Sequence, residues 1–121
     1  MRSSLTLLLV FLLIATVIPM LADAQADFPR LVSVTPDTGK IGDVLTVEGQ
    51  NLDRKTVKEL YLTDGKKDYK TEIIEQAETS IKFKIPGNAK PGRFSLMVLT
   101  AGKEPKLIEE PVKINVEEAQ P

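Results

Sequence analysis

Cysteine and histidine are both absent from the 121-residue sequence. Their absence excludes disulfides, thiol nucleophiles and triads that depend on a histidine base. Carboxylates could still act as acid and base, but adjacent glutamates in a strand point to opposite faces, and the other candidates surround a polar turn. These candidates are Glu109-Glu110, Glu117-Glu118 and the set Asp64, Asp68 and Glu72. We interpret them as solvated surface charges, so the sequence predicts neither an enzyme nor a cofactor. The aspartates are also too scattered to predict a metal site.

Aromatic residues and strong charge are scarce as well. The chain has no tryptophan and only two tyrosines, Tyr61 and Tyr69, so a broad aromatic platform for a polysaccharide is hard to build. The formal net charge is −1, and the basic pairs Arg54-Lys55 and Lys66-Lys67 are short. A nucleic-acid interface needs a clustered basic face. The sequence therefore predicts no nucleic-acid binding.

The N-terminal segment has the pattern of a signal peptide. Arg2 precedes an apolar stretch, residues 5–18, that only two threonines interrupt, and Ala22, Ala24 and Ala26 follow. The stretch suits the apolar region of a signal peptide and is shorter than the roughly 20 residues that cross a bilayer as a helix. We predict a signal peptide over residues 1–24, export to the periplasm, cell surface or medium, and no membrane span after cleavage. An uncleaved N-terminal anchor is the alternative.

From residue 28 onward, apolar residues alternate over short stretches that turn residues separate, and no window shows helical spacing. The clearest alternation is 81–85, where three apolar residues alternate with two lysines. In the first predicted strand, Val32 and Val34 share one face. Asp64-Gly65 suits a tight turn between the third and fourth strands. The predicted strands are 30–35, 43–49, 58–63, 68–75, 81–85, 93–100 and 111–116.

This rhythm predicts an all-β fold. About seven short antiparallel strands over roughly 90 residues suit an immunoglobulin-like β-sandwich of two sheets. A small barrel is the competing architecture, because periodicity does not distinguish two packed sheets from one closed sheet. We assign residues 28–117 to a single domain and residues 118–121 to a polar tail.

Turn residues at fixed offsets carry a resemblance to a known family. Residues 29–39 read Pro-Arg-Leu-Val-Ser-Val-Thr-Pro-Asp-Thr-Gly, and residues 45–52, after Gly42, read Leu-Thr-Val-Glu-Gly-Gln-Asn-Leu. With Pro91-Gly92 before the sixth strand, this pattern resembles the IPT/TIG domains of plexins and transcription factors, in a secreted bacterial single-domain form. Leu52 stands where the family usually has an aromatic residue. The resemblance implies an immunoglobulin-like sandwich but no particular function, because these modules serve in many kinds of protein.

The sixth strand predicts a candidate binding surface. If Phe94 and its alternate neighbours face the core, Met97 and Leu99 must point outward. The third and sixth strands are neighbours in the immunoglobulin arrangement, so Tyr61 would lie beside them. We hypothesise that Tyr61, Met97 and Leu99 form a small exposed apolar patch that binds another protein or a second copy. In the alternative, residues 101–110 fold back over the sixth strand and bury both its faces.

These features predict a non-catalytic exported module, either an interaction domain or a structural one, that binds protein at the cell envelope. A small carbohydrate-binding module or accessory domain is the alternative function, with a polysaccharide as the partner.

Overall fold

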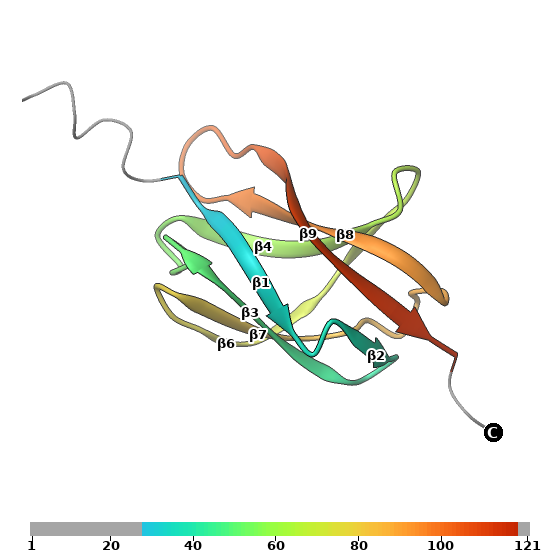
Figure 1. The fold of residues 1–121 in the computed structure, drawn as a ribbon. Coiled ribbons are helices and arrows are strands. Elements are labelled where there is room, and N and C mark those ends of the chain that lie inside the picture. Colours follow the sequence, from blue (N-terminus) through green and yellow to red (C-terminus); the bar gives the residue numbers. More distant parts are fainter. Residues whose placement is uncertain (1–27, 119–121) are drawn as a thin grey trace, which may run out of the picture.

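The computed structural model describes residues 28–118. The predicted signal peptide and the last three residues of the predicted polar tail lie outside this range. Residues 28–118 form nine strands in two sheets that pack face to face (Figure 1). This part of the chain contains no helix, and therefore no helix that is long and apolar enough to cross a membrane.

The two sheets have four and five strands. The four-stranded sheet has the order β1-β3-β7-β6; its strands are β1 (Arg30–Thr35), β3 (Val44–Gln50), β7 (Ser80–Lys84) and β6 (Glu72–Gln76). The five-stranded sheet has the order β2-β9-β8-β4-β5; its strands are β2 (Thr38–Lys40), β9 (Leu107–Glu117), β8 (Gly92–Thr100), β4 (Val57–Thr63) and β5 (Asp68–Lys70). This arrangement confirms the immunoglobulin-like sandwich and excludes the single closed barrel.

The strand count differs from the expected seven in two places. β2 is a short additional strand that pairs with β9 in parallel, whereas the other pairs are antiparallel. The predicted strand 68–75 divides into β5 and β6, which belong to different sheets. Buried Thr71 lies at the division, and both its backbone N–H and its hydroxyl donate to the carbonyl oxygen of Leu60, at 2.9 and 2.8 Å. These bonds hold the chain where it passes from one sheet to the other.

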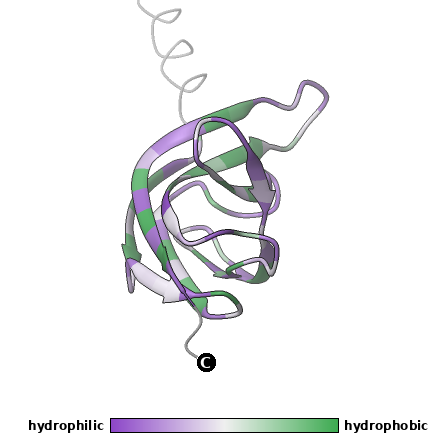
Figure 2. Ribbon diagram, turned by 90° about the vertical axis from the view of Figure 1, so that its right-hand side faces the viewer, coloured by the Kyte–Doolittle hydropathy of each residue, from purple (hydrophilic) through white to green (hydrophobic). Residues whose placement is uncertain are grey.

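The hydrophobic core lies between the sheets and consists of the alternate residues of each strand. Apolar and polar segments alternate along the ribbon accordingly (Figure 2). The fully buried large side chains come from both sheets and include Leu45, Val47, Leu60, Leu62, Ile81, Phe83, Leu96 and Ile114. Each such side chain contributes about 1.5–3 kcal/mol by leaving water. Tyr69 and Phe94 add an edge-to-face ring contact, with centroids 5.7 Å apart.

The first strand does not keep the simple alternation that its sequence predicts. Its register against β3 shifts between Leu31 and Ser33, which marks a β-bulge. Leu31 is buried, Val32 is exposed and Val34 is half-buried. Val32 and Val34 therefore do not share a core-facing surface, because the bulge changes the direction of the side chains that follow it.

Candidate functional site

The outer face of the five-stranded sheet brings the predicted site residues together. Tyr61 of β4 lies directly opposite Met97 of β8, and Leu99 of β8 lies opposite Leu107 of β9. Residues two apart on a strand share a face, and opposite residues on paired strands are side-chain neighbours. We call Tyr61, Met97, Leu99 and Leu107 the apolar block. Leu107 is missing from the sequence hypothesis because the seventh predicted strand begins only at residue 111, whereas β9 begins at Leu107.

The exposure of these side chains differs from the expectation. Met97 is only 8% exposed, Tyr61 and Leu99 are half-buried, and Leu107 is 54% exposed. Met97 lies on a central strand between Tyr61 on one side and Glu109 on the other, and such neighbours cover a side chain without any overlying loop. The fold-back alternative is also wrong, because residues 107–110 continue β9 alongside β8. A binding role for these residues stays a prediction.

Charged side chains border the apolar block. Glu59 lies opposite Leu99, and Lys70 lies opposite Tyr61. The Tyr61 hydroxyl donates a hydrogen bond to Glu59 Oε2, and Lys70 Nζ lies 3.4 Å from Glu59 Oε1. Both oxygens of one carboxylate therefore have partners at the edge of the block.

This border sets the protonation states of Tyr61 and Glu59. The hydrogen bond to Glu59, together with partial burial, raises the pKa of Tyr61 to about 12. The hydrogen bond from Tyr61 and the nearby Lys70 ammonium lower the pKa of Glu59, against the opposing effect of burial. At neutral pH the phenol is therefore neutral and the carboxylate is ionised, so the hydroxyl remains a donor to Glu59.

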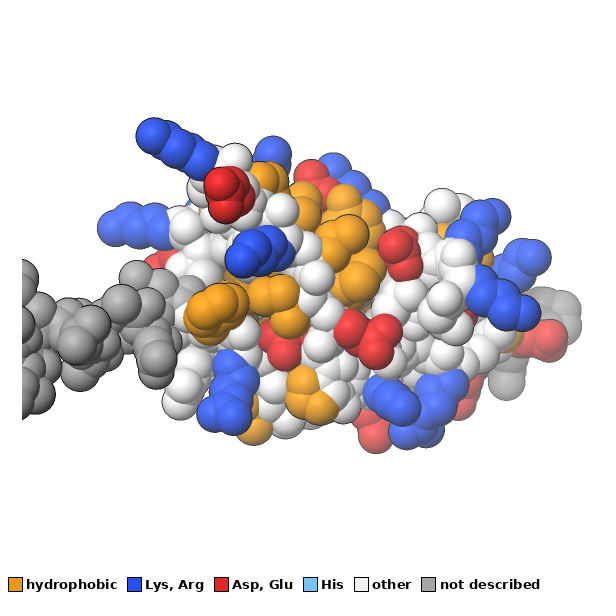
Figure 3. All heavy atoms as spheres, turned by 90° about the horizontal axis from the view of Figure 1, so that it is seen from above, with side chains coloured by type: hydrophobic (Ala, Val, Ile, Leu, Met, Phe, Trp, Pro, Cys, Tyr) orange, Lys and Arg blue, Asp and Glu red, His pale blue; other side chains and the backbone are white. Residues whose placement is uncertain are grey.

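The outer face of the four-stranded sheet has a different character. Lys82 pairs with Glu75 at 3.5 Å, and Lys84 pairs with Glu72 at 3.8 Å; all four side chains are largely exposed. Exposed ion pairs of this kind are solvated and contribute little stability. By contrast, the upper side of the molecule in Figure 1, along which β9 and β8 run, has hydrophobic side chains gathered near its middle and charged ones around them (Figure 3). The four-stranded sheet also exposes Val32, Val44 and Ile74, but none of these is a register partner of another. The two outer faces therefore differ in the arrangement of their apolar side chains, which are adjacent on one face and scattered on the other.

Asp64, one of the acid–base candidates, has a structural role in the predicted turn. Asp64 Oδ1 accepts the backbone N–H groups of Lys66 and Lys67 at 2.8 and 2.7 Å, and these bonds lower its pKa. This is the chemistry of the predicted turn, in which Gly65 has a φ of 91°. Within residues 28–118, no group of three or more carboxylates converges as a metal site would require.

Glu110 contradicts the expectation of solvated surface charge. It is 8% exposed, and its Oε1 atom is buried without a hydrogen-bond partner. Burial raises the pKa of Glu110, although a backbone hydrogen bond from Leu31 and the charge of Arg30 oppose the shift. Adjacent Glu109 is exposed, so the two side chains do point to opposite faces. Sequence alone could not identify the buried member, because the bulge between β8 and β9 at this point is a tertiary feature.

Two sheets of four and five strands around one core define an immunoglobulin-like β-sandwich domain. Residues 29–113, more than half of the chain, match the IPT/TIG domain. The chain therefore belongs to the IPT/TIG family. No curated protein matches the sequence.

Several solved structures share this fold. A Bacteroides thetaiotaomicron protein of unknown function aligns with a TM-score of 0.63 at 20% identity, over 77% of this chain and 22% of its own. The Bacteroides ovatus protein SGBP-B, solved with a mixed-linkage heptasaccharide, aligns with a TM-score of 0.53 at 19% identity, over 76% of this chain and 23% of its own. The Gamma-CGTase of Alkalophilic bacillus clarkii aligns with a TM-score of 0.55 at 17% identity, over 73% of this chain and 13% of its own. This chain thus spans a quarter or less of each, and at such identities the likeness establishes the fold alone.

Proposed function

We propose that this IPT/TIG domain is an exported, non-catalytic interaction module that binds another protein at the cell envelope. The binding surface is the outer face of the five-stranded sheet, centred on the apolar block. The observation that carries the proposal is the contiguity of the apolar block, whose four side chains are neighbours on the adjacent strands β4, β8 and β9. The exposed apolar residues of the four-stranded sheet, Val32, Val44 and Ile74, are separated from one another.

The composition of the apolar block suits a protein interface. Tyrosine and methionine are enriched at the centres of interfaces, where charged residues are depleted, and the rim is polar. Tyr61, Met97, Leu99 and Leu107 occupy neighbouring positions, and the Glu59–Lys70 pair lies at their border. Leu107, the most exposed member at 54%, would lose the largest share of water contact when a partner binds.

Export is part of the proposal and rests on the sequence. The apolar stretch over residues 5–18 and the small residues after it follow the order of a secretory signal. The absence of cysteine suits a domain whose hydrophobic core holds it together without disulfides. The partner is accordingly expected in the periplasm, on the cell surface or outside the cell.

The test is affinity capture by the protein expressed from its full sequence, from an extract of its own cell envelope. The first variant carries Leu99→Lys and Leu107→Lys, which place two charges in the apolar block. Met97 is left unchanged, because a substitution at a buried position would also affect folding. We expect the wild type to retain a defined protein partner and the double variant to lose it.

The matched control carries Val44→Lys and Ile74→Lys. These residues are 46% and 47% exposed and belong to the four-stranded sheet, so the control adds the same charge to the other sheet. Thermal unfolding verifies that each variant folds, and the single variant Leu107→Lys replaces the double one if that is unstable. Sedimentation of the purified proteins shows whether the partner is a second copy. Retention of the same material by all forms, or by none, refutes the proposed face.

Carbohydrate binding is the second candidate function. The observation that favours it is a cleft at the end of the sandwich where β1 begins, which no member of the apolar block lines.

A further inference from the structure

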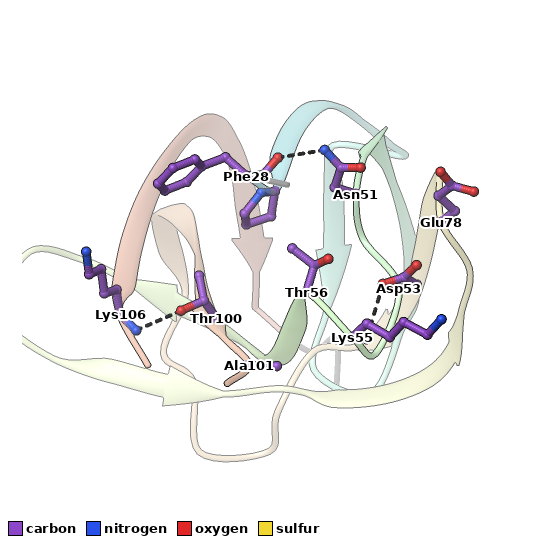
Figure 4. Close-up of a pocket in the computed structure, with 10 residues that line it drawn as sticks. Phe28, Asn51, Asp53, Lys55, Thr56, Glu78, Thr100, Ala101 and Lys106 are labelled. Atoms are coloured by element: carbon purple, nitrogen blue, oxygen red, sulfur yellow. Dashed lines mark hydrogen bonds between the residues drawn. The ribbon is translucent and has the colours of Figure 1, made fainter. Parts of the chain in front are cut away.

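A cleft of about 520 Å³ lies at the end of the sandwich where β1 begins. Its walls come from stretches far apart in sequence: residues 28–29, the loop 51–56 after β3, the turn between β6 and β7, and the connection from β8 to β9 (Figure 4). The volume is within the range of about 300–1,000 Å³ that small-molecule sites occupy. No member of the apolar block lines the cleft, so it is a separate feature.

An exposed aromatic ring forms part of one wall. Phe28 is 63% exposed and stands on the same side as Lys106, opposite Asp53 and Glu78 (Figure 4). The side-chain amide of Asn51 donates to the backbone carbonyl of Phe28 at 3.0 Å. This bond joins the chain ahead of β1 to the loop after β3. The backbone of Phe28 is therefore held beside the cleft, while most of the residue's surface is open to water.

The rest of the lining is polar and its charges balance. Two carboxylates, Asp53 and Glu78, and two ammonium groups, Lys55 and Lys106, line the cleft together with the hydroxyl of Thr56. Equal numbers of positive and negative groups produce no strong net field to attract an ion. They do provide many hydrogen-bond donors and acceptors. The cleft therefore suits an uncharged ligand that carries many hydroxyl groups and one apolar face.

Hydrogen bonds hold the walls in place. The side-chain amide of Gln76 donates to the carbonyl oxygens of Leu52 and Val57, at 2.8 and 2.9 Å. The backbone N–H of Ala101 donates to the carbonyl of Thr56 at 2.8 Å. These bonds link the loop after β3 to β6 and to the end of β8. A site whose walls are ordered before binding loses less entropy when a ligand arrives.

From this arrangement we infer that the cleft binds a neutral oligosaccharide. The C–H face of a sugar ring packs on Phe28, and its hydroxyl groups exchange hydrogen bonds with Asp53, Glu78 and Thr56. The inference is independent of the protein-binding face, because the two sites share no residue. The sequence has no tryptophan and only two tyrosines, and Phe28 is the aromatic residue that lines the cleft.

The test uses the protein expressed from its full sequence and four neutral probes: cellohexaose, maltohexaose, xylohexaose and mannohexaose. Calorimetry measures affinity, and saturation-transfer NMR together with amide shifts of Asn51 and Thr56 locates the ligand. We expect at least one probe to bind with a dissociation constant below about 1 mM. Phe28→Ala should weaken that binding about tenfold, and Phe28→Trp should retain or strengthen it.

Two controls separate the cleft from the rest of the surface. Val44→Ala removes an exposed apolar side chain from outside the cleft and should leave affinity unchanged. The double variant Leu99→Lys and Leu107→Lys should bind the sugar like the wild type even where it loses its protein partner. The inference is overturned if no neutral probe binds, if only a charged probe such as oligogalacturonate binds, or if Phe28→Ala binds as tightly as the wild type.

Discussion

At the scale of single residues, Glu110 is the side chain least suited to its surroundings. Its carboxyl is buried, and one oxygen has no hydrogen-bond partner. Because burial raises its pKa in the folded protein, the protonated form is favoured by folding. The buried carboxyl therefore costs no stability below the ordinary glutamate pKa of about 4.3, where it is protonated in both the folded and the unfolded state. The free energy of unfolding falls as the pH rises from there through the pKa of Glu110 in the folded protein.

We expect Glu110→Gln to stabilise the protein at pH 7 by about 1 kcal/mol, because an amide needs no charge in this place and can still accept from Leu31. The gain should vanish towards pH 4, where the carboxyl of the wild type is protonated. Urea unfolding between pH 4 and pH 8 measures the difference. Glu109→Gln, at the exposed neighbouring position, is the control. A gain that does not change with pH, or an equal gain in the control, would contradict this account.

At the scale of strands, the pairing of β1 with β3 depends on one glycine. A Cβ atom on Gly49 would lie 1.9 Å from the carbonyl oxygen of Arg30, which is backbone and cannot move aside cheaply. The two strands approach this closely where Leu31 lies opposite Gly49. The glycine here serves a close approach of two backbones and not a special backbone angle.

Gly49→Ala is therefore expected to displace β1 and to destabilise the domain by roughly 1–3 kcal/mol. Gly87→Ala is the matched control, since a Cβ there meets nothing within 4 Å, and it should change stability by less than about 0.5 kcal/mol. Chemical denaturation measures both, and amide exchange of residues 30–35 reports on β1 directly. Equal stability of the two variants would show that β1 adjusts without cost.

At the scale of the whole molecule, the two sheets share a single core, so they should unfold together. Ile81 of the four-stranded sheet and Leu60 of the five-stranded sheet belong to the same buried cluster. Both tyrosines belong to the five-stranded sheet, on β4 and β5. Tyrosine fluorescence therefore reports on one sheet, and far-ultraviolet circular dichroism reports on both.

Ile81→Val removes one methylene group from the four-stranded sheet and should cost about 0.5–1.5 kcal/mol. If unfolding is a single transition, tyrosine fluorescence and circular dichroism should show the same lowered midpoint. A fluorescence midpoint that stays at the wild-type value while the dichroism midpoint falls would show that the sheets unfold separately.

Sequence alone was sufficient for the strands in which side-chain direction is a local property. The alternations at 81–85 and 93–100 correspond to β7 and β8, and their alternate apolar members, Ile81, Phe83, Phe94, Leu96 and Val98, face the core. The turn at Asp64-Gly65 is local in the same way, because one carboxylate and one glycine satisfy its backbone. Together with the turn residues between positions 29 and 52, these patterns were enough to predict the sandwich fold and the IPT/TIG family.

Only the tertiary structure decided how deeply each candidate side chain is buried, and the candidate sites depend on that burial. Thr71 divides a continuous alternation between two sheets. The burial of Met97 depends in part on Tyr61 of β4, a strand that β5, β6 and β7 separate from β8 along the chain. The same holds for buried Glu110, for Leu107 in the apolar block and for Phe28 beside the cleft. The physical reason is that alternation fixes the face of a side chain, whereas its exposure depends on the side chains that distant strands place beside it.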